Sequence, residues 1–272
     1  METEILKAFK IYKRIVFTAD TDLSFWKSFL ERAIDEYCIK NPNNIELFTS
    51  VFCAYNFNLD KNEGYLKSSD NIRLIEKNNL KKCGDDFFSS ISLLLILKNY
   101  VAIETFILQA IHIKYFYLQG SLLGNRKAAS RINNEIKAYL KEINIKSDNK
   151  NNRHIIEFLK SKSTSISSFL SSKIRVDLDT SWGNFFEIIS ILRNIIAHQD
   201  QVVTSDTINE IKSKGKILFK NHFITKKKEV DKANFTLNIK NTSNFLAFFN
   251  DFSLNIVKLM FEEKDLKFLG MN

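Results

Sequence analysis

Residues that interrupt helices are scarce in this sequence. Proline occurs once, at Pro42, and glycine occurs seven times among 272 residues. Because proline and glycine are the residues least compatible with a helix interior, this scarcity predicts an all-α chain. The length is sufficient for one large domain or two small ones with a hydrophobic core. The 24 phenylalanines predict that aromatic rings fill much of that core.

Metal-binding and redox patterns are also poorly represented. The three cysteines, Cys38, Cys53 and Cys83, show no CxxC spacing, and the four histidines are scattered. We therefore expect no structural metal site, no cofactor and a reducing, cytoplasmic location, since the first residues contain no apolar signal core. The chain has no P-loop, GxGxxG or HExxH motif, so nucleotide hydrolysis, dinucleotide binding and zinc proteolysis find no support.

One long apolar run, residues 91–118, raises the question of a membrane span. Lys98, Glu104, His112 and Lys114 interrupt it. Each charge at the centre of a bilayer costs about 2.5–3.5 kcal/mol on insertion scales. The pattern therefore favours a buried central helix without membrane contact, in which His112 is a packed or hydrogen-bonded core residue.

Positive charge is concentrated in one part of the chain. The formal net charge is +9, and residues 121–175 contain twelve Lys and Arg against four Asp and Glu. A local basic surface suits a polyanion such as RNA. The alternative is that a chain generally rich in Lys, Asn and Ile carries this charge without a role.

Helical periodicity suggests how the chain is organised. Residues 1–80 are expected to form an N-terminal extension of several short helices, one of them over 45–55. Residues 85–265 are expected to form one helical body with a basic insertion at 121–175. Within that body the sequence predicts these segments: a long helix from 85 to about 119, a loop over 144–153, a helix over 184–198 capped by Thr180 or Ser181, and an amphipathic helix over 243–261.

The helix over 184–198 carries the candidate site. On a helical wheel one face of this helix is apolar, whereas Glu187, Asn194 and His198 lie on the opposite, polar face with Arg193 at the border. The apolar face consists of Phe185, Ile188, Ile189, Leu192, Ile195 and Ile196. A lone histidine is usually a structural residue, but Asn194 precedes His198 by one turn and could orient its imidazole. His154 and His222 lie in polar stretches with no evident partner. Arg193 and His198 point about 140° apart on a regular helix, which favours a composite cleft.

These residue types fit the chemistry of RNA cleavage without metal. The 2′-hydroxyl attacks the adjacent phosphorus, a base removes its proton and an acid protonates the departing 5′-oxygen. Histidine titrates near neutrality and can serve either role, while arginine can stabilise the charge that develops on the phosphoryl oxygens. One histidine per chain is sparse for two proton transfers, and a symmetric dimer would bring two histidines and two arginines into one cleft.

The string Arg193-Asn194-Ile195-Ile196-Ala197-His198 resembles the motif of the HEPN superfamily, an arginine and a histidine with four to six residues between them. The long helix around Tyr100–Phe106 and the closing helix over 243–261 extend the resemblance to about residues 85–265. It implies a HEPN-like helical bundle, and a catalytic pair of Arg193 and His198 supported by Asn194. Glu187 and Glu104 are weaker assignments as supporting residues of this site. For Glu104 an ion pair with a lysine is an equally weighted structural alternative.

The resemblance implies a metal-independent endoribonuclease of the toxin or anti-phage abortive-infection type, whose partners are RNA, a second copy of the chain, and an antitoxin or regulatory protein. Two alternatives remain. The chain could be a catalytically inactive HEPN-like module that binds nucleic acid or a partner protein. It could also be an unrelated helical scaffold in which Arg193 and His198 only cap a helix end.

Overall fold

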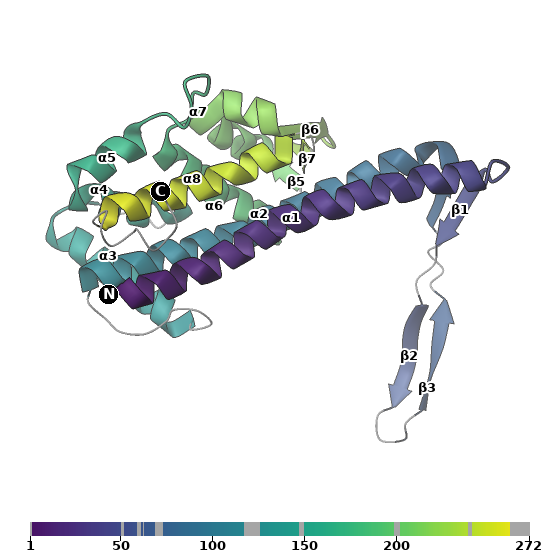
Figure 1. The fold of residues 1–272 in the computed structure, drawn as a ribbon, viewed down its shortest axis with the longest axis horizontal. Helices are drawn as coiled ribbons and strands as arrows, with labels where there is room; N and C mark the ends of the chain where they lie inside the picture. The colour runs from purple at the N-terminus through teal and green to yellow at the C-terminus, as the bar shows by residue number, and fades with distance from the viewer. Residues whose placement is uncertain are drawn as a thin grey trace. The chain divides into compact units, whose positions relative to one another are not determined.

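The computed structural model describes residues 2–49, 52–58, 61, 63–68, 73–116, 126–146, 150–198, 202–238 and 241–261. The chain divides into two units, a helical body made of Met1–Leu23 and Ser89–Asn272, and a smaller unit made of Ser24–Phe88. Figure 1 shows that helices dominate the described residues, as the sequence predicts. The helices are α1 (Glu2–Lys40), α2 (Leu80–Ile111), a π-helix (His112–Phe116), α3 (Arg126–Glu142), α4 (Arg153–Lys162), α5 (Thr164–Ser171), α6 (Trp182–His198), α7 (Ser205–His222) and α8 (Thr242–Met260), with 3-10 turns at Lys77–Asn79 and Lys150–Asn152.

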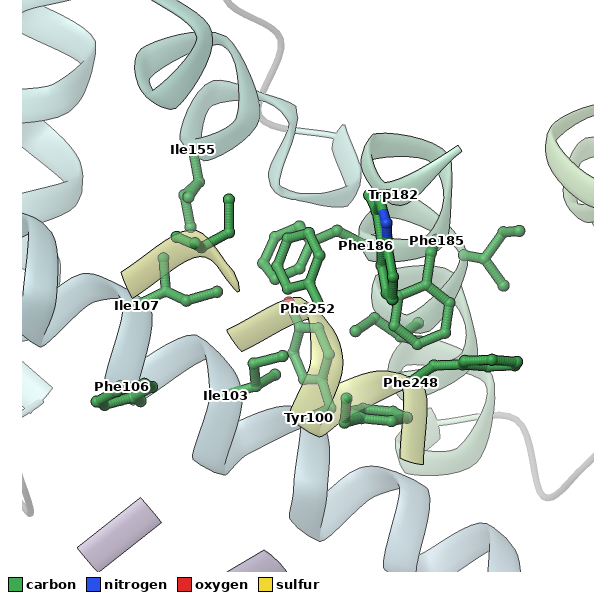
Figure 2. Packing of buried hydrophobic residues seen from close by; sticks show 14 of the residues in the cluster. Tyr100, Ile103, Phe106, Ile107, Ile155, Trp182, Phe185, Phe186, Phe248 and Phe252 are labelled. Carbon is green, nitrogen blue, oxygen red and sulfur yellow. The ribbon is translucent and has the colours of Figure 1, made fainter. Parts of the chain in front are cut away.

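Aromatic packing between α6 and α8 forms the centre of the body. Phe185 and Phe186 of α6 are fully buried, and the Phe186 ring stacks on Phe252 of α8 with ring centroids 5.3 Å apart. Figure 2 shows Tyr100 and Ile103 of α2 beside these rings. The prediction of an aromatic core is confirmed. Burial of rings of this size is the main stabilising contribution to the body.

The three helices most clearly patterned in the sequence are present. The Ser181 Oγ accepts the backbone N–H of Asn184 at 3.2 Å, which confirms the predicted N-terminal cap of α6. Helix α8 matches the amphipathic helix predicted over 243–261. Helix α2 is long and apolar enough to cross a membrane by length and composition, yet Leu93, Ile96 and Ile103 are completely buried in the protein core. These contacts agree with the prediction of a central helix.

The predicted basic insertion at 121–175 is part of the core, and its description as an insertion is corrected. Helices α3, α4 and α5 occupy most of its described residues, which are 126–146 and 150–175. Ile132, Ile136 and Leu140 recur every four residues on one face of α3 and are buried in the same apolar cluster as α6. Most of the lysines and arginines of this segment occupy the other, more exposed faces. Amphipathic helices of this kind form a layer of the bundle.

A small antiparallel sheet adds to the helical body, which stays mostly helical and consistent with the predicted all-α class. Its strands are β5 (Val202–Thr204), β6 (Phe223–Lys227) and β7 (Lys232–Leu237), in the order β5-β7-β6. Phe223 pairs with Leu237 in register, and the Phe223 ring stacks on Phe235 at 4.8 Å. In β7 polar and apolar residues alternate from Lys232 to Leu237, which favours a strand over a helix.

The predicted N-terminal extension of short helices over 1–80 is wrong in two respects. Helix α1 is a single helix of 39 residues, and its first part packs in the body, where Ile5, Tyr12 and Val16 are buried. The predicted helix over 45–55 is replaced by strands. The smaller unit contains two antiparallel pairs, β1 (Glu46–Thr49) with β4 (Arg73–Glu76) and β2 (Phe52–Asn58) with β3 (Glu63–Ser68). Short apolar runs rich in aromatic residues fit either a helix or a strand, so periodicity alone misassigned this segment.

Candidate functional site

Helix α6 carries the predicted arginine, asparagine and histidine at its C-terminal end. Arg193 and Asn194 are half-buried, and the Arg193 Nη1 donates to the Asn194 Oδ1 at 2.8 Å. His198 is the last residue of α6, and its side chain lies outside the described part of the structure. The orientation of the imidazole by Asn194 therefore stays a prediction, whereas the contact between Asn194 and Arg193 is observed.

A buried tyrosine of α2 connects this end of α6 to its neighbours. The guanidinium carbon of Arg193 lies 5.8 Å from the centroid of the Tyr100 ring, within the range of a cation–π contact. The Tyr100 hydroxyl lies 3.3 Å from the Ser190 Oγ, one turn before Arg193 on α6. Burial raises the pKa of Tyr100 well above its ordinary value, and the nearby Glu104 carboxylate adds to this effect. The hydroxyl therefore keeps its proton and can donate it to an acceptor.

That acceptor is Glu104, which follows Tyr100 by one turn of α2. The Tyr100 hydroxyl donates to the Glu104 Oε1 at 3.2 Å, and the Asn152 Nδ2 donates both to this Oε1, at 2.5 Å, and to the Tyr100 hydroxyl oxygen. The partners described for Glu104 are thus neutral side chains, where the alternative interpretation expected a lysine. Tyr100 contacts both Arg193 and Glu104, so the structure brings these two predicted residues into one polar cluster.

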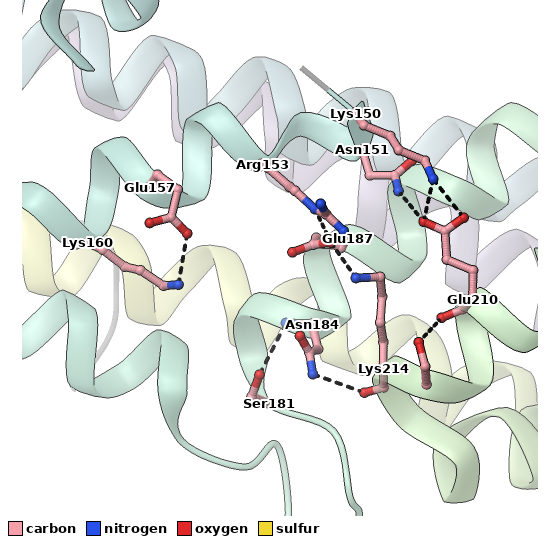
Figure 3. Close-up of polar contacts among 11 residues, drawn as sticks. Lys150, Asn151, Arg153, Glu157, Lys160, Ser181, Asn184, Glu187, Glu210 and Lys214 are labelled. Atoms are coloured by element: carbon pink, nitrogen blue, oxygen red, sulfur yellow. Dashed lines mark hydrogen bonds and ion pairs between the residues drawn. The ribbon is translucent and has the colours of Figure 1, made fainter. Parts of the chain in front are cut away.

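Glu187, the other predicted acid, has different partners. Its Oε2 accepts from the Lys214 Nζ of α7 at 2.6 Å and from the Arg153 Nε of α4 at 2.8 Å (Figure 3). The side chains of Glu187 and Lys214 are 15% and 12% exposed. The Asn184 Nδ2 also donates to the Lys214 carbonyl oxygen, at 3.2 Å. Glu187 therefore joins α4, α6 and α7, and two cations already neutralise its charge.

Four consecutive residues, Lys150 to Arg153, contact three different helices. Lys150 and Asn151 both donate to Glu210 of α7, and Arg153 reaches Glu187 of α6 (Figure 3). Asn152 reaches the Tyr100 cluster. The backbones of Asn151 and Asn152 are left-handed, with φ of 55° and 57°. Asparagine is the side chain that tolerates this conformation best after glycine, because its short amide bonds locally.

The sequence predicts a loop over 144–153, and the predicted site lacks Tyr100, Ser190 and Asn152, which the structure adds. The available signal was the pair of adjacent asparagines, a residue type favoured at left-handed positions. The contacts themselves join residues far apart in the chain, such as Tyr100 and Asn152, and periodicity contains no information about them.

The remaining histidines have structural roles. His154 and His222, expected to have no organised partner, are both buried; the His154 Nε2 lies 2.9 Å from the Asn133 Oδ1, and the His222 Nδ1 lies 3.2 Å from the Asn241 carbonyl oxygen. Burial lowers the pKa of His154 to about 4 and also lowers the pKa of His222. His112 is buried in the π-helix, as predicted. Across the described residues, no three His, Cys, Asp or Glu side chains converge as a metal site would require.

Comparison with protein-family models, with curated proteins and with solved structures found no match to this chain. The likeness to HEPN domains consequently depends on the Arg193–His198 motif and on the helices that surround it. The geometry adds a half-buried arginine near the end of a core helix, in contact with the Asn194 amide and with a protonated tyrosine, whose hydroxyl bonds to Glu104 and Asn152.

Proposed function

We propose that this chain is a metal-independent endoribonuclease of the HEPN type, acting as a toxin or an anti-phage abortive-infection effector. The observation that carries the proposal is the position of Arg193. It lies half-buried at the C-terminal end of α6, against Tyr100 and close to the motif histidine in sequence. A guanidinium held by an aromatic ring and an amide has little freedom to reorganise, which is what stabilisation of developing phosphoryl charge requires.

The proposed reaction is an internal transfer at phosphorus. The 2′-oxygen of a ribose attacks the adjacent phosphorus while a base accepts the 2′-hydroxyl proton. The bond from phosphorus to the 5′-oxygen breaks as an acid donates a proton to that oxygen. The products are a 2′,3′-cyclic phosphate and a free 5′-hydroxyl. We assign His198 as the group that moves a proton, and Arg193 as the cation on the phosphoryl oxygens.

A second copy of the chain supplies the other proton-transfer group in this proposal. Each chain provides one motif histidine, and His154, His222 and His112 are buried in structural positions. A twofold axis next to the end of α6 would place two copies of Arg193 and His198 around one phosphate. Exposed lysines and arginines of α3 offer sequence-independent contacts to the RNA backbone, so binding should weaken as salt increases.

Product chemistry tests the proposal directly. Purified protein is incubated with structured RNA in EDTA, and the fragment ends are identified. We expect 2′,3′-cyclic phosphates, and a loss of about a hundredfold or more for Arg193→Ala and for His198→Ala. Arg175→Ala is the matched control, because Arg175 is an exposed arginine whose observed partner is Asp177. In cells, expression should arrest growth and Arg193→Ala should relieve the arrest.

Two results would contradict parts of the proposal. RNA that stays intact but is bound by the protein would favour an inactive nucleic-acid-binding module. A monomeric variant that retains full cleavage activity would show that one chain contains the complete site, and the dimeric cleft would be wrong.

A further inference from the structure

An open apolar groove lies on the body between α1 and α2, and the proposed function does not use it. The two helices pack through Tyr12 and Phe106, whose stacked rings are 4.8 Å apart. The groove beside this contact has a volume of about 470 Å³. Its lining residues are Ala8, Ile11, Tyr12 and Ile15 of α1, and Leu94, Leu97, Lys98, Val101, Ala102, Thr105, Phe106 and Gln109 of α2.

The rim of the groove exposes apolar side chains that a monomer would be expected to cover. Leu94 and Val101 lie seven residues apart on the same face of α2 and are 53% and 49% exposed. Leu97 and Ile11, which also line the groove, are partly exposed. A contiguous exposed apolar surface of this kind marks an interaction site more often than a free surface.

The described charges at the groove are mostly positive. Lys98 carries the only charge among the described lining residues. On α1, Lys7 and Arg14 lie one turn before and one turn after Ile11 and are exposed, with Lys7 paired to Glu4 on the same helix. An apolar floor with a cationic rim complements a ligand that has an apolar stripe and acidic flanks.

We propose that this groove binds an amphipathic, acidic α-helix of a partner protein. The lined part of α2, from Leu94 to Gln109, is roughly 22 Å long, which accommodates about four turns of a helix. A helix bound in a groove presents apolar side chains every three or four residues and places acidic residues on either side. A second copy of this chain is the less suitable occupant, because it would bring the same cations to the rim and an overall charge of +9.

The position of the groove connects it with α2 but leaves the two proposals independent. Tyr100 and Glu104 lie on the face of α2 that contacts the α6 cluster, whereas Leu94, Val101 and Thr105 lie on the groove face. Binding in the groove can be measured whether or not the protein cleaves RNA, so failure of one proposal does not affect the other.

Two synthetic helical peptides of about 16 residues test the proposal. They share the same leucines at helical spacing and differ only in the flanking residues, which are glutamates in one and lysines in the other. Binding to the full chain is measured by fluorescence anisotropy. We expect saturable binding of the acidic peptide, at least about tenfold tighter than the lysine peptide, and weaker binding at higher salt.

Variants of the chain locate the binding surface. Arg14→Glu with Lys98→Glu should weaken binding of the acidic peptide about tenfold and favour the lysine peptide. Val101→Gln should weaken binding of the acidic peptide. Lys220→Glu, a single reversal at an exposed position of α7, is the control for net charge and should change binding less than twofold. Circular dichroism confirms that each variant is folded.

Four outcomes would overturn the proposal. Neither peptide binds, or both bind equally well, or Lys220→Glu weakens binding as much as the double reversal in the groove. The fourth outcome is a different occupant. If the chain forms a dimer in light scattering that Val101→Gln dissociates, a second copy fills the groove. If the chain binds anionic phospholipid vesicles through Val101 and does not bind the acidic peptide, a lipid surface does.

Discussion

The ion pairs of Glu187 give a quantitative test of what this acid does. Glu187→Gln keeps the shape of the side chain and removes its charge, which leaves Lys214 without a counter-charge at a position only 12% exposed. Removal of one partner of a buried ion pair costs about 3–5 kcal/mol. Arg153 is 37% exposed and remains hydrated, so its share is small. We therefore expect the free energy of unfolding to fall by about 2–4 kcal/mol.

Urea denaturation followed by circular dichroism measures this loss. Glu157→Gln is the matched control, since Glu157 pairs with Lys160 on the same helix at a more exposed site, where the two side chains are 37% and 34% exposed, and its cost should stay below about 1 kcal/mol. The double variant Glu187→Gln with Lys214→Gln should lose less stability than the two single variants together. The difference in free energy of unfolding should be at least about 1 kcal/mol.

Two results would refute this reasoning. One is a Glu187→Gln protein whose free energy of unfolding lies within about 0.5 kcal/mol of that of the parent. The other is a double variant whose loss of stability equals the sum of the losses in the two single variants. RNA cleavage separates structure from catalysis. If the protein cleaves RNA, folded Glu187→Gln should retain its activity. Loss of cleavage without loss of stability would assign Glu187 to the reaction instead.

Other predictions follow from single contacts. Tyr100→Phe removes the hydroxyl shared by Glu104 and Asn152 and should cost about 1–3 kcal/mol in urea denaturation; an unchanged midpoint would argue against the cluster. Burial lowers the pKa of His154 from 6.5 to about 4, so the unfolded state binds more protons than the folded state between these pH values. On acidification through this window the free energy of unfolding should therefore fall by about 1.4 kcal/mol per pH unit. In His154→Gln it should fall less steeply. Gly215→Ala would place its Cβ 2.0 Å from the Oγ1 of the fully buried Thr180, so we expect a lower melting temperature and a cost of about 1–3 kcal/mol, whereas an unchanged melting temperature would show that Thr180 moves freely.

The parts of the fold that the sequence predicts correctly are those with long, one-sided patterns. Helix α8 repeats phenylalanines at helical spacing, and α6 combines an apolar face with a serine cap. The segment 45–58 has no long apolar repeat and no recognisable cap. Its apolar runs are too short to distinguish the period of two of a strand from the period of 3.6 of a helix. The positive charge of residues 126–175 led to the prediction of a basic insertion for another reason. Composition counts all faces of a helix together, whereas the buried Ile132 and Ile136 show that one face of α3 belongs to the core.

The candidate site divides in the same way. Arg193, Asn194 and Glu104 were identified individually, since each is recognisable from a motif or from its place in an apolar helix. Their connection through Tyr100 and Asn152 was not predictable, because it depends on side chains that meet only after three helices have packed. Glu187 illustrates the converse. Its place on the polar face of α6 was predicted, but its partners on α4 and α7 are decided by tertiary structure.

The Lys150–Arg153 segment also constrains how the length of this chain can vary. Surface connections usually tolerate inserted residues, because few contacts depend on their register. Here four successive side chains bond to α2, α6 and α7, and Asn152 directly precedes α4. One residue inserted between Asn151 and Asn152 would move Lys150 and Asn151 out of register with Asn152 and Arg153, so that the two pairs of contacts could not form together. In evolution and in engineering alike, substitutions should be accepted here more readily than any change of length, and insertions of tags or domains should be placed in other connections.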